Sequence, residues 1–392
     1  MTVHELDRAR IDSVLREGVD RGAAPGVSAV VVDREGVLYE GAFGERELDT
    51  GNAMTFDSVG AIFSMTKAIT AAAAMQLVER GSLQLDAPAS DVCPELTDRQ
   101  VLTGFDADGQ PLLRQAASAP TLRQLLTHTS GFGYELFNAE LVRWHEVTGV
   151  PGLASNGPGM RQAPLVSDPG TRWEYGIGID WVGAMIEAVT GQRLGDFFAE
   201  HLTGPLGMTD TAYVPTSSMS DRVASMHVRL PDGSLMAFPL PAPEPGAHQG
   251  GGAGLFATMG DYGRFIRMIL RDGELDGVRV LAADTVAQMV TNQMGDLRVE
   301  PLVSAMPNLT NDAEFFPGET KSWGMSFQIN DAPAETGRPA GTLMWAGLAN
   351  SYFWIDRSNG IGGAYLSQIL PFADVSSVEL FTAFETAVYA SR

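Results

Sequence analysis

The chain of 392 residues has 44% hydrophobic and 19% charged side chains, a balance typical of folded globular proteins that excludes wholesale disorder. Its formal charge of −22 opposes binding to nucleic acids and anionic membranes, because both would repel it. The single cysteine, Cys93, excludes an intramolecular disulfide and a cysteine-based zinc site. The N-terminal segment is charged and has no apolar signal core, so we expect a cytoplasmic protein.

The N-terminal part predicts a helix, a strand pair and a second, apolar helix. Hydrophobic residues recur at helical spacing in the first segment, and two β-branched runs then flank the turn Glu35-Gly36. An Ala- and Met-rich segment follows, with Gly81 at its C-terminal end, and predicts a buried helix. The predicted ranges are a helix at 3–21, strands at 26–34 and 37–43, and a helix at 64–80.

Strand signals are sparse in the middle of the chain, where helical segments alternate with Gly- and Pro-rich loops. One short hairpin is predicted at 226–238, with its turn at Pro231-Asp232-Gly233. The glycine run 250–254 is not followed by the strand–helix unit of a dinucleotide site, and we interpret Asp261 as the cap of the next helix. The predicted helices cover 122–127, 179–190, 195–201, 261–271 and 282–292.

After Trp323 the strand pattern returns. Strands are predicted at 323–330, 341–347, 351–356 and 363–370, and a last helix at 375–390. Strands at both chain ends indicate an α+β fold, in which the two ends build one antiparallel sheet flanked by helices. We therefore expect an α/β sheet domain from residues 1–82 and 320–392, and a mostly helical inserted domain from residues 83–319.

The segment Ser64-Met65-Thr66-Lys67 puts a hydroxyl and an amine three residues apart, on one face of a predicted helix. A serine hydroxyl is a weak nucleophile that needs a base within hydrogen-bond reach, and a neutral, partly desolvated lysine can be that base. The helix N-terminus would favour an oxyanion beside the serine. Lysine occurs only at Lys67 and Lys321, and Lys67 lies in an apolar segment where an unpaired charge is costly, which favours function over chance spacing.

Two further segments contain tyrosine and histidine candidates. Tyr175 is predicted on a loop just before a helix, where it could shuttle protons or, judged by position alone, anchor the core. His128, in LLTHTSG, is interpreted as a histidine hydrogen-bonded in a turn, because nothing nearby completes a triad. Tyr134, a few residues further on, could line a pocket.

The segment Trp345-Ala346-Gly347 ends a predicted strand. Its glycine would let the backbone approach a catalytic serine closely enough for an N–H group to bind an oxyanion, and an ordinary strand end is the alternative. The sequence contains no Gly-x-Ser-x-Gly, no HExxH and no P-loop, and its six histidines lack metal-ligand spacing. We therefore expect neither a metal nor a cofactor.

Taken in order, five segments resemble those of the serine β-lactamase and penicillin-binding-protein superfamily. They are most similar to its family VIII carboxylesterases and the related statin-type acyltransferases. The segments are SMTK (64–67), LLTHTSG (125–131), WEYG (173–176), PLGMTDT (205–211) and GGAGLFAT (251–258). The resemblance covers most of the chain, from Pro25 to about residue 390.

This resemblance implies a role for each matching residue. Ser64 would be the acylated nucleophile, Lys67 its general base, and Tyr175 the tyrosine that moves the proton to the leaving group and then activates water. The oxyanion hole would be formed by the backbone N–H groups of Ser64 and Leu348. The residues implied to bind the substrate are Tyr134, Trp345 and Gly347.

Two positions depart from the pattern of the β-lactamases and peptidases. Where those enzymes have Tyr-x-Asn this chain has Tyr175-Gly176-Ile177, and where they have Lys-Thr-Gly it has Trp345-Ala346-Gly347. The missing lysine and asparagine help to hold a carboxylate and an amide, whereas tryptophan suits an apolar acyl or alcohol group. The sequence therefore favours a serine carboxylesterase of short-chain carboxylic esters, with weak β-lactam turnover allowed as a side activity.

Two other functions stay open. An acyltransferase would use the same residues but give the acyl group to an alcohol instead of water. A non-catalytic ligand-binding protein on the same scaffold is the alternative of another class, although it would not need Ser64, Lys67 and Tyr175 as a set. The expected partner is a small-molecule ester, with neither nucleic acid nor membrane, and the oligomeric state is left open.

Overall fold

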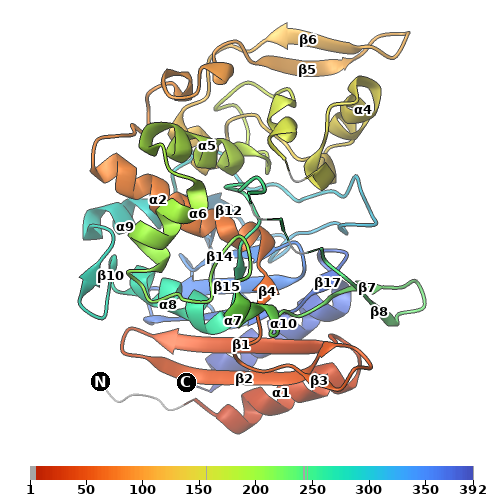
Figure 1. Ribbon diagram of the computed structural model, residues 1–392, viewed down its shortest axis with the longest axis vertical. Coiled ribbons are helices and arrows are strands. Elements are labelled where there is room, and N and C mark those ends of the chain that lie inside the picture. The colour runs from red at the N-terminus through yellow and green to blue at the C-terminus, as the bar shows by residue number, and fades with distance from the viewer. Residues whose placement is uncertain (1–5, 156, 242, 245, 392) are drawn as a thin grey trace.

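The protein is described by a computed structural model that covers residues 6–155, 157–241, 243–244 and 246–391. Strands from both ends of the chain form one eight-stranded sheet, in which neighbouring strands are antiparallel (Figure 1). In sheet order these strands are β12 (Lys321–Trp323), β13 (Gln328–Asn330), β14 (Leu343–Gly347), β15 (Ser351–Asp356), β16 (Ile361–Leu366), β1 (Gly26–Asp33), β2 (Val37–Glu47) and β3 (Asn52–Ala53). The predicted α+β fold with a sheet built from both ends is confirmed.

Helices cover both faces of this sheet, which explains why its strands are apolar runs. Successive side chains of a strand point to opposite faces. Phe353 of β15 packs on Tyr262, with ring centroids 5.1 Å apart, while the next residue, Trp354, packs on Phe384 at 5.6 Å. Tyr262 and Phe384 belong to different helices. The helices against the sheet are α1 (Arg8–Asp20), α8 (Met259–Leu270) and α10 (Val375–Ala390).

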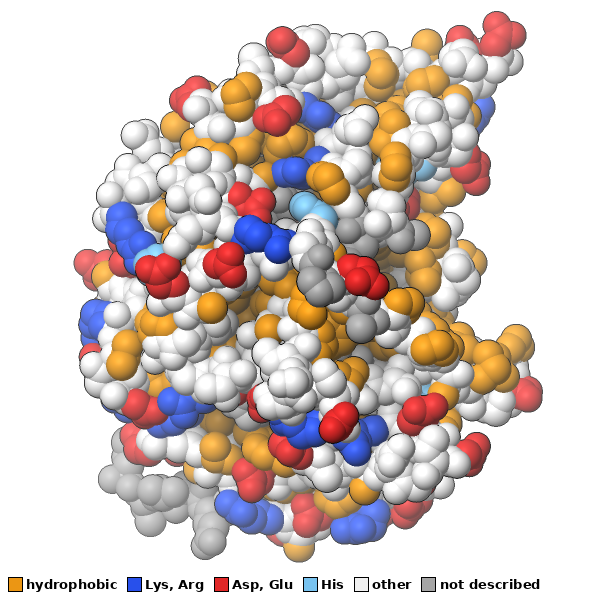
Figure 2. All heavy atoms as spheres, viewed as in Figure 1, with side chains coloured by type: hydrophobic (Ala, Val, Ile, Leu, Met, Phe, Trp, Pro, Cys, Tyr) orange, Lys and Arg blue, Asp and Glu red, His pale blue; other side chains and the backbone are white. Residues whose placement is uncertain are grey.

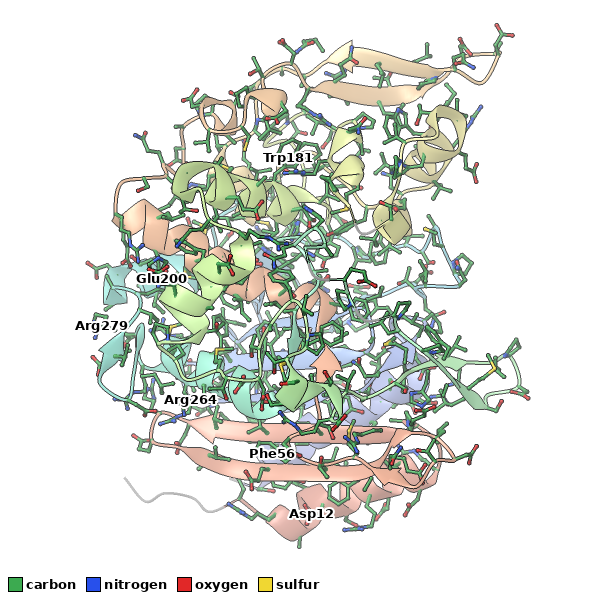
Figure 3. All side chains as sticks on the ribbon, viewed as in Figure 1. Asp12, Phe56, Trp181, Glu200, Arg264 and Arg279 are labelled. Atoms are coloured by element: carbon green, nitrogen blue, oxygen red, sulfur yellow. The ribbon has the colours of Figure 1, made fainter. Side chains whose placement is uncertain are left out.

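The remaining helices lie mostly above the sheet in the view of Figure 1. They are α2 (Thr66–Glu79), α3 (Leu122–Leu126), α4 (Ala139–Thr148), α5 (Gly178–Thr190), α6 (Leu194–Phe198), α7 (Ser217–Ser220) and α9 (Ala283–Met289). In Figure 3, Trp181 marks α5 in this upper part, and Asp12 marks α1 below the sheet. Asp12 accepts a hydrogen bond from the Tyr39 hydroxyl at 2.8 Å, which fixes α1 to β2.

Among the described residues, three strand pairs and one three-stranded group lie outside the main sheet. They are β4 (Gly60–Ala61) with β9 (Phe256–Ala257), β5 (Gln100–Phe105) with β6 (Pro111–Gln115), β10 (Glu274–Leu275) with β11 (Val278–Arg279), and the group β17 (Ile369–Leu370), β7 (Met226–Arg229) and β8 (Leu235–Phe238). The β7–β8 hairpin was predicted, whereas β5–β6 and α4 were not. The division into a sheet domain and an inserted domain stays a prediction.

Helix α8 corrects one detail of the sequence interpretation. Its N-terminal cap is Thr258, whose hydroxyl accepts the backbone N–H of Asp261 at 3.1 Å. The interpretation of Asp261 as the cap is therefore wrong. Asp261 lies inside the first turn, and its carboxylate accepts the Asp210 N–H at 2.8 Å and the Thr211 hydroxyl at 2.9 Å. Burial raises the pKa of Asp261 to about 6.

Over the described ranges, none of the helices combines the length and the apolar character needed to cross a membrane.

Candidate active site

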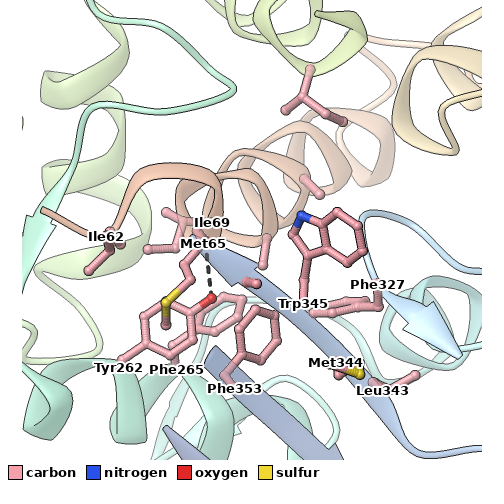
Figure 4. Packing of buried hydrophobic residues seen from close by; sticks show 14 of the residues in the cluster. Ile62, Met65, Ile69, Tyr262, Phe265, Phe327, Leu343, Met344, Trp345 and Phe353 are labelled. Atoms are coloured by element: carbon pink, nitrogen blue, oxygen red, sulfur yellow. Dashed lines mark hydrogen bonds between the residues drawn. The ribbon is translucent and has the colours of Figure 1, made fainter. Parts of the chain in front are cut away.

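Ser64 lies in a tight 3-10 turn, η1 (Phe63–Met65), that leads directly into α2. The turn is anchored to α8, because the Tyr262 hydroxyl of that helix donates to the Met65 carbonyl at 3.0 Å (dashed line in Figure 4). Phe63, just before the serine, has φ +41°, a conformation that residues other than glycine rarely adopt. Strain of this kind clusters at functional sites and persists only where the surroundings hold it in place.

Lys67 is fully buried on the first turn of α2, and its amine has three polar neighbours. Its Nζ lies 3.0 Å from the Ser64 Oγ, 2.7 Å from the carbonyl oxygen of Gly252 and 3.2 Å from the Tyr134 hydroxyl. The structure thus brings the predicted nucleophile within hydrogen-bond reach of the predicted base, as nucleophilic catalysis requires.

Asp180 is the polar residue of this cluster that sequence analysis missed. It is 4% exposed, lies in the first turn of α5 and accepts the Tyr134 hydroxyl at 3.2 Å and the Gly252 N–H at 3.0 Å. Burial, reinforced by the nearby Asp180 carboxylate, holds the pKa of Tyr134 well above its usual value. In sequence, Asp180 resembles any acidic residue at a helix N-terminus, and only the fold shows that it faces Tyr134.

Tyr175 lies on the loop before α5, as predicted, and its hydroxyl is held by tryptophan. The Trp345 Nε1–H donates to the Tyr175 hydroxyl at 3.0 Å, and the two ring centroids are 4.9 Å apart. The Lys67 Nζ lies 5.0 Å from the centroid of the Tyr175 ring. The segment Trp345-Ala346-Gly347 therefore contacts the WEYG segment directly, through the residue that replaces the lysine of the β-lactamase pattern.

His128 supports the same loop. Its buried ring lies 4.6 Å from that of Tyr175, and its Nδ1 accepts the Gly176 N–H at 3.4 Å. Burial lowers the pKa of His128, and the nearby Lys67 side chain adds to the lowering. This hydrogen bond to the backbone agrees with the prediction that His128 is hydrogen-bonded in a turn and is not the catalytic base.

Gly347 allows β14 to end against the turn that carries Ser64. A Cβ at this position would lie 2.4 Å from the carbonyl oxygen of Ile62, so no larger residue fits without a shift of the backbone. Gly347 and Leu348 both line the same cavity as Ser64. The oxyanion roles of the Ser64 and Leu348 N–H groups stay a proposal.

The cavity above Ser64 has a volume of about 370 Å³, and its described lining residues include no charged side chain. Its polar side chains are Ser64, Tyr134, Tyr175 and Trp345. Hydrophobic side chains also gather over the β7–β8 hairpin beside the hollowed side of the molecule (Figure 2). The apolar part of the lining includes Leu136, Phe137, Leu153, Met226, Phe238, Leu240, Leu302, Leu309, Leu370 and Phe372.

The chain belongs to the family described as Beta-lactamase, whose pattern matches residues 11–385. Protein Rv1367c of Mycobacterium tuberculosis is 33% identical over 380 residues, which cover 93% of this chain and 90% of that protein. The lovastatin esterase of Penicillium rubens is 31% identical over 398 residues, covering 97% and 98%. The structure of the LovD6 mutant of simvastatin synthase from Aspergillus terreus matches with a TM-score of 0.83 at 29% identity, covering 97% and 96%.

These comparisons confirm the resemblance to the serine β-lactamase-like superfamily. Similar proteins with a named activity include an esterase and a methylbutanoyltransferase. Together they support an enzyme that acts on esters or acyl groups through serine chemistry.

Proposed function

We propose that this chain is a serine carboxylesterase that hydrolyses uncharged carboxylic esters through an acyl-enzyme on Ser64. One observation carries the proposal: Ser64 lines a cavity whose described lining has no charged side chain, and the buried Lys67 Nζ lies 3.0 Å from its Oγ. The 31% identity to a lovastatin esterase supports the same chemistry. A cytoplasmic location and a small-molecule partner remain part of this proposal.

In the acylation step, the Lys67 amine takes the proton of Ser64 as the Oγ attacks the ester carbonyl carbon. The negative charge that forms on the carbonyl oxygen would be stabilised by the N–H groups of Ser64 and Leu348. Tyr175 then passes a proton to the departing alkoxide, and the alcohol leaves. Tyr175, which has given up its proton, takes one from water as the water oxygen attacks the acyl carbon. The Ser64 Oγ then leaves and takes back the proton held by Lys67, and the acid is released.

The lining of the cavity selects against charged substrates. A substrate carboxylate buried there would lose its hydration and find no arginine or lysine among the described lining residues, which is costly. We therefore expect β-lactams, which carry such a carboxylate, to be at best weakly turned over, and esters with short, uncharged acyl groups to be accepted.

The experiment compares two esters of one alcohol, p-nitrophenyl butyrate and mono-p-nitrophenyl succinate, whose acyl groups differ chiefly in a terminal carboxylate. We expect kcat/KM for the butyrate to exceed that for the succinate by about a hundredfold or more, since an unpaired buried carboxylate costs several kcal/mol. Equal kcat/KM values would contradict the substrate assignment.

Two further readouts separate the alternatives. Added alcohols would divert the acyl group of a transferase into a new ester even at low concentration, whereas an esterase would release mainly the acid. A binding protein would bind the ester without releasing p-nitrophenol, and Ser64→Ala would bind it equally well.

A further inference from the structure

A lysine that acts as a base must direct its lone pair at the serine, and the surroundings of Lys67 decide whether it can. A neutral amine has two N–H groups and one lone pair. The carbonyl oxygen of Gly252 is acceptor-only, so it takes one N–H at 2.7 Å. The Tyr134 hydroxyl, at 3.2 Å, is ambiguous, because it could accept the second N–H or donate its own proton to the lone pair.

The direction of the Tyr134 hydroxyl therefore matters for catalysis. If its proton points at Lys67, it occupies the lone pair and blocks the base. If its proton points away, the hydroxyl accepts the second N–H and leaves the lone pair free for the Ser64 hydroxyl, 3.0 Å away.

We propose that Asp180 is a positioning residue that sets this direction, because its carboxylate takes the Tyr134 proton and so keeps the Lys67 lone pair free for Ser64. The inference rests on the proposed function, in which Lys67 is the base. Asp180 acts on Lys67 through two hydrogen-bond partners, and the direction of the hydroxyl is set through one of them, Tyr134.

Three observations support the assignment. Asp180 lies in the first turn of α5, where the helix N-terminus stabilises an ionised carboxylate, and an ionised carboxylate can only accept. Its Oδ2 lies 3.2 Å from the Tyr134 hydroxyl. Burial keeps the pKa of Tyr134 high, so its hydroxyl retains a proton to donate.

The second oxygen of Asp180 fixes the other partner of the amine. Its Oδ1 accepts the Gly252 N–H at 3.0 Å, and the carbonyl of the same residue accepts from Lys67. The neighbouring carbonyls are also taken, that of Gly251 by the Thr70 hydroxyl and that of Gly250 by the Tyr213 hydroxyl, both at 2.7 Å. The glycine run is thus held as a rigid backbone acceptor beside the amine.

The experiment measures the acylation rate with p-nitrophenyl butyrate by stopped-flow detection of the p-nitrophenol burst. In Asp180→Asn, the amide oxygen can still accept the Gly252 N–H, so the amide NH2 faces Tyr134 and reverses its hydroxyl. We expect acylation to slow by about a hundredfold, within the usual contribution of general base catalysis, with a smaller change in KM.

The decisive variant adds Tyr134→Phe to Asp180→Asn. Without the hydroxyl nothing is left to reverse, so the double variant should acylate faster than Asp180→Asn and as fast as Tyr134→Phe alone. Asp180→Ala also frees the Gly252 N–H, so there Tyr134→Phe should restore only part of the rate, and this pair serves if Asp180→Asn folds poorly. Glu187→Gln is the matched control, because it removes a carboxylate of the same helix that accepts from the Leu194 N–H instead.

The inference would be overturned if the rate losses of Asp180→Asn and Tyr134→Phe multiplied in the double variant. An Asp180 that only supported the fold would not be rescued by removal of the Tyr134 hydroxyl. An Asp180→Asn enzyme with wild-type acylation would overturn it as well. A wild-type protein that shows no burst and no turnover would instead contradict the proposed function on which the inference rests.

Discussion

Trp345 shows how a single substitution relative to the β-lactamase pattern changes the site. Where those enzymes have a lysine, this chain has an indole whose N–H donates to the Tyr175 hydroxyl at 3.0 Å. The tyrosine oxygen is thereby used as an acceptor, so its own proton is free to point into the cavity that both residues line. Compared with the lysine of the β-lactamase pattern, Trp345 puts no positive charge at the cavity, and its N–H group orients the Tyr175 hydroxyl.

Trp345→Phe should therefore weaken catalysis while it keeps an aromatic ring beside Tyr175. The lost hydrogen bond is worth about 1–1.5 kcal/mol, which corresponds to about a tenfold decrease in kcat/KM. Steady-state kinetics with p-nitrophenyl butyrate measures the decrease. Trp354→Phe is the control, because that buried indole lies against Phe384 on the α10 face of the sheet, and its kcat/KM should stay at the wild-type value.

Sequence reasoning named residues that belong to local motifs, whereas it missed Asp180 and the contacts that join distant segments. The spacing from Ser64 to Lys67 is local, so it could be recognised before the fold was known. Asp180 meets Tyr134 across 46 positions of the chain, and Trp345 meets Tyr175 across 170. No local pattern encodes such pairs, because they depend on how distant elements pack.

At the scale of elements, the three glycines 250–252 allow α2 and α5 to pack closely against the loop that carries them. Lys67 and Thr70 of α2 donate to its carbonyls, and Asp180 of α5 accepts its N–H. A Cβ at Gly252 would lie 2.4 Å from the Asp180 Oδ2 and 2.9 Å from the Tyr134 hydroxyl. The close approach therefore requires glycine here.

Gly252→Ala should push Asp180 and Tyr134 apart and lower kcat/KM by at least about tenfold, since misplaced catalytic groups are costly even at ångström scale. Gly36→Ala is the control, because a Cβ at that turn position meets nothing within 4 Å and φ is not positive there. Kinetics and thermal melts of both variants separate the effects. Equal activity of the two variants would count against a tight contact at Gly252.

Burial of an apolar face made an element easier to predict from the sequence. Helix α10 was predicted with its observed bounds, since its apolar residues are buried against the sheet and keep helical spacing. The β5–β6 hairpin was missed because β6 exposes nearly all of its side chains and so lacks hydrophobic alternation. An exposed strand pair leaves little trace in the sequence.

For the whole molecule, a buried ion pair ties the C-terminal helix to the sheet. Arg338, on the loop between β13 and β14, donates through Nε and Nη2 to the carboxylate of Glu385 on α10, the second contact at 2.6 Å. Both side chains are at most 1% exposed. Each charge is therefore tolerated only because the other one is present.

Arg338→Met should lower the free energy of unfolding by about 3–5 kcal/mol, because it leaves the Glu385 carboxylate buried without its partner. Arg338→Met combined with Glu385→Leu should recover most of that loss, since no uncompensated charge remains. Urea denaturation at neutral pH measures both. A single variant as stable as the wild type would show that water reaches Glu385.

The overall architecture was the most predictable feature. Both chain ends contain apolar strand runs, and β1 pairs directly with β16, with Ser28 opposite Leu366. A sheet covered on both faces needs such runs, and so its existence could be read from the sequence. The cavity could not, because its lining comes from segments between Ala61 and Phe372 that no pattern connects.

The acyl-enzyme on Ser64 is the central claim, and mass spectrometry tests it most directly. The wild type is quenched during turnover of p-nitrophenyl butyrate and digested, and Ser64→Ala is treated in parallel. We predict a butyryl group on the Ser64 peptide of the wild type, together with loss of hydrolysis in Ser64→Ala. Undiminished hydrolysis by Ser64→Ala, or an adduct on another residue, would contradict the account.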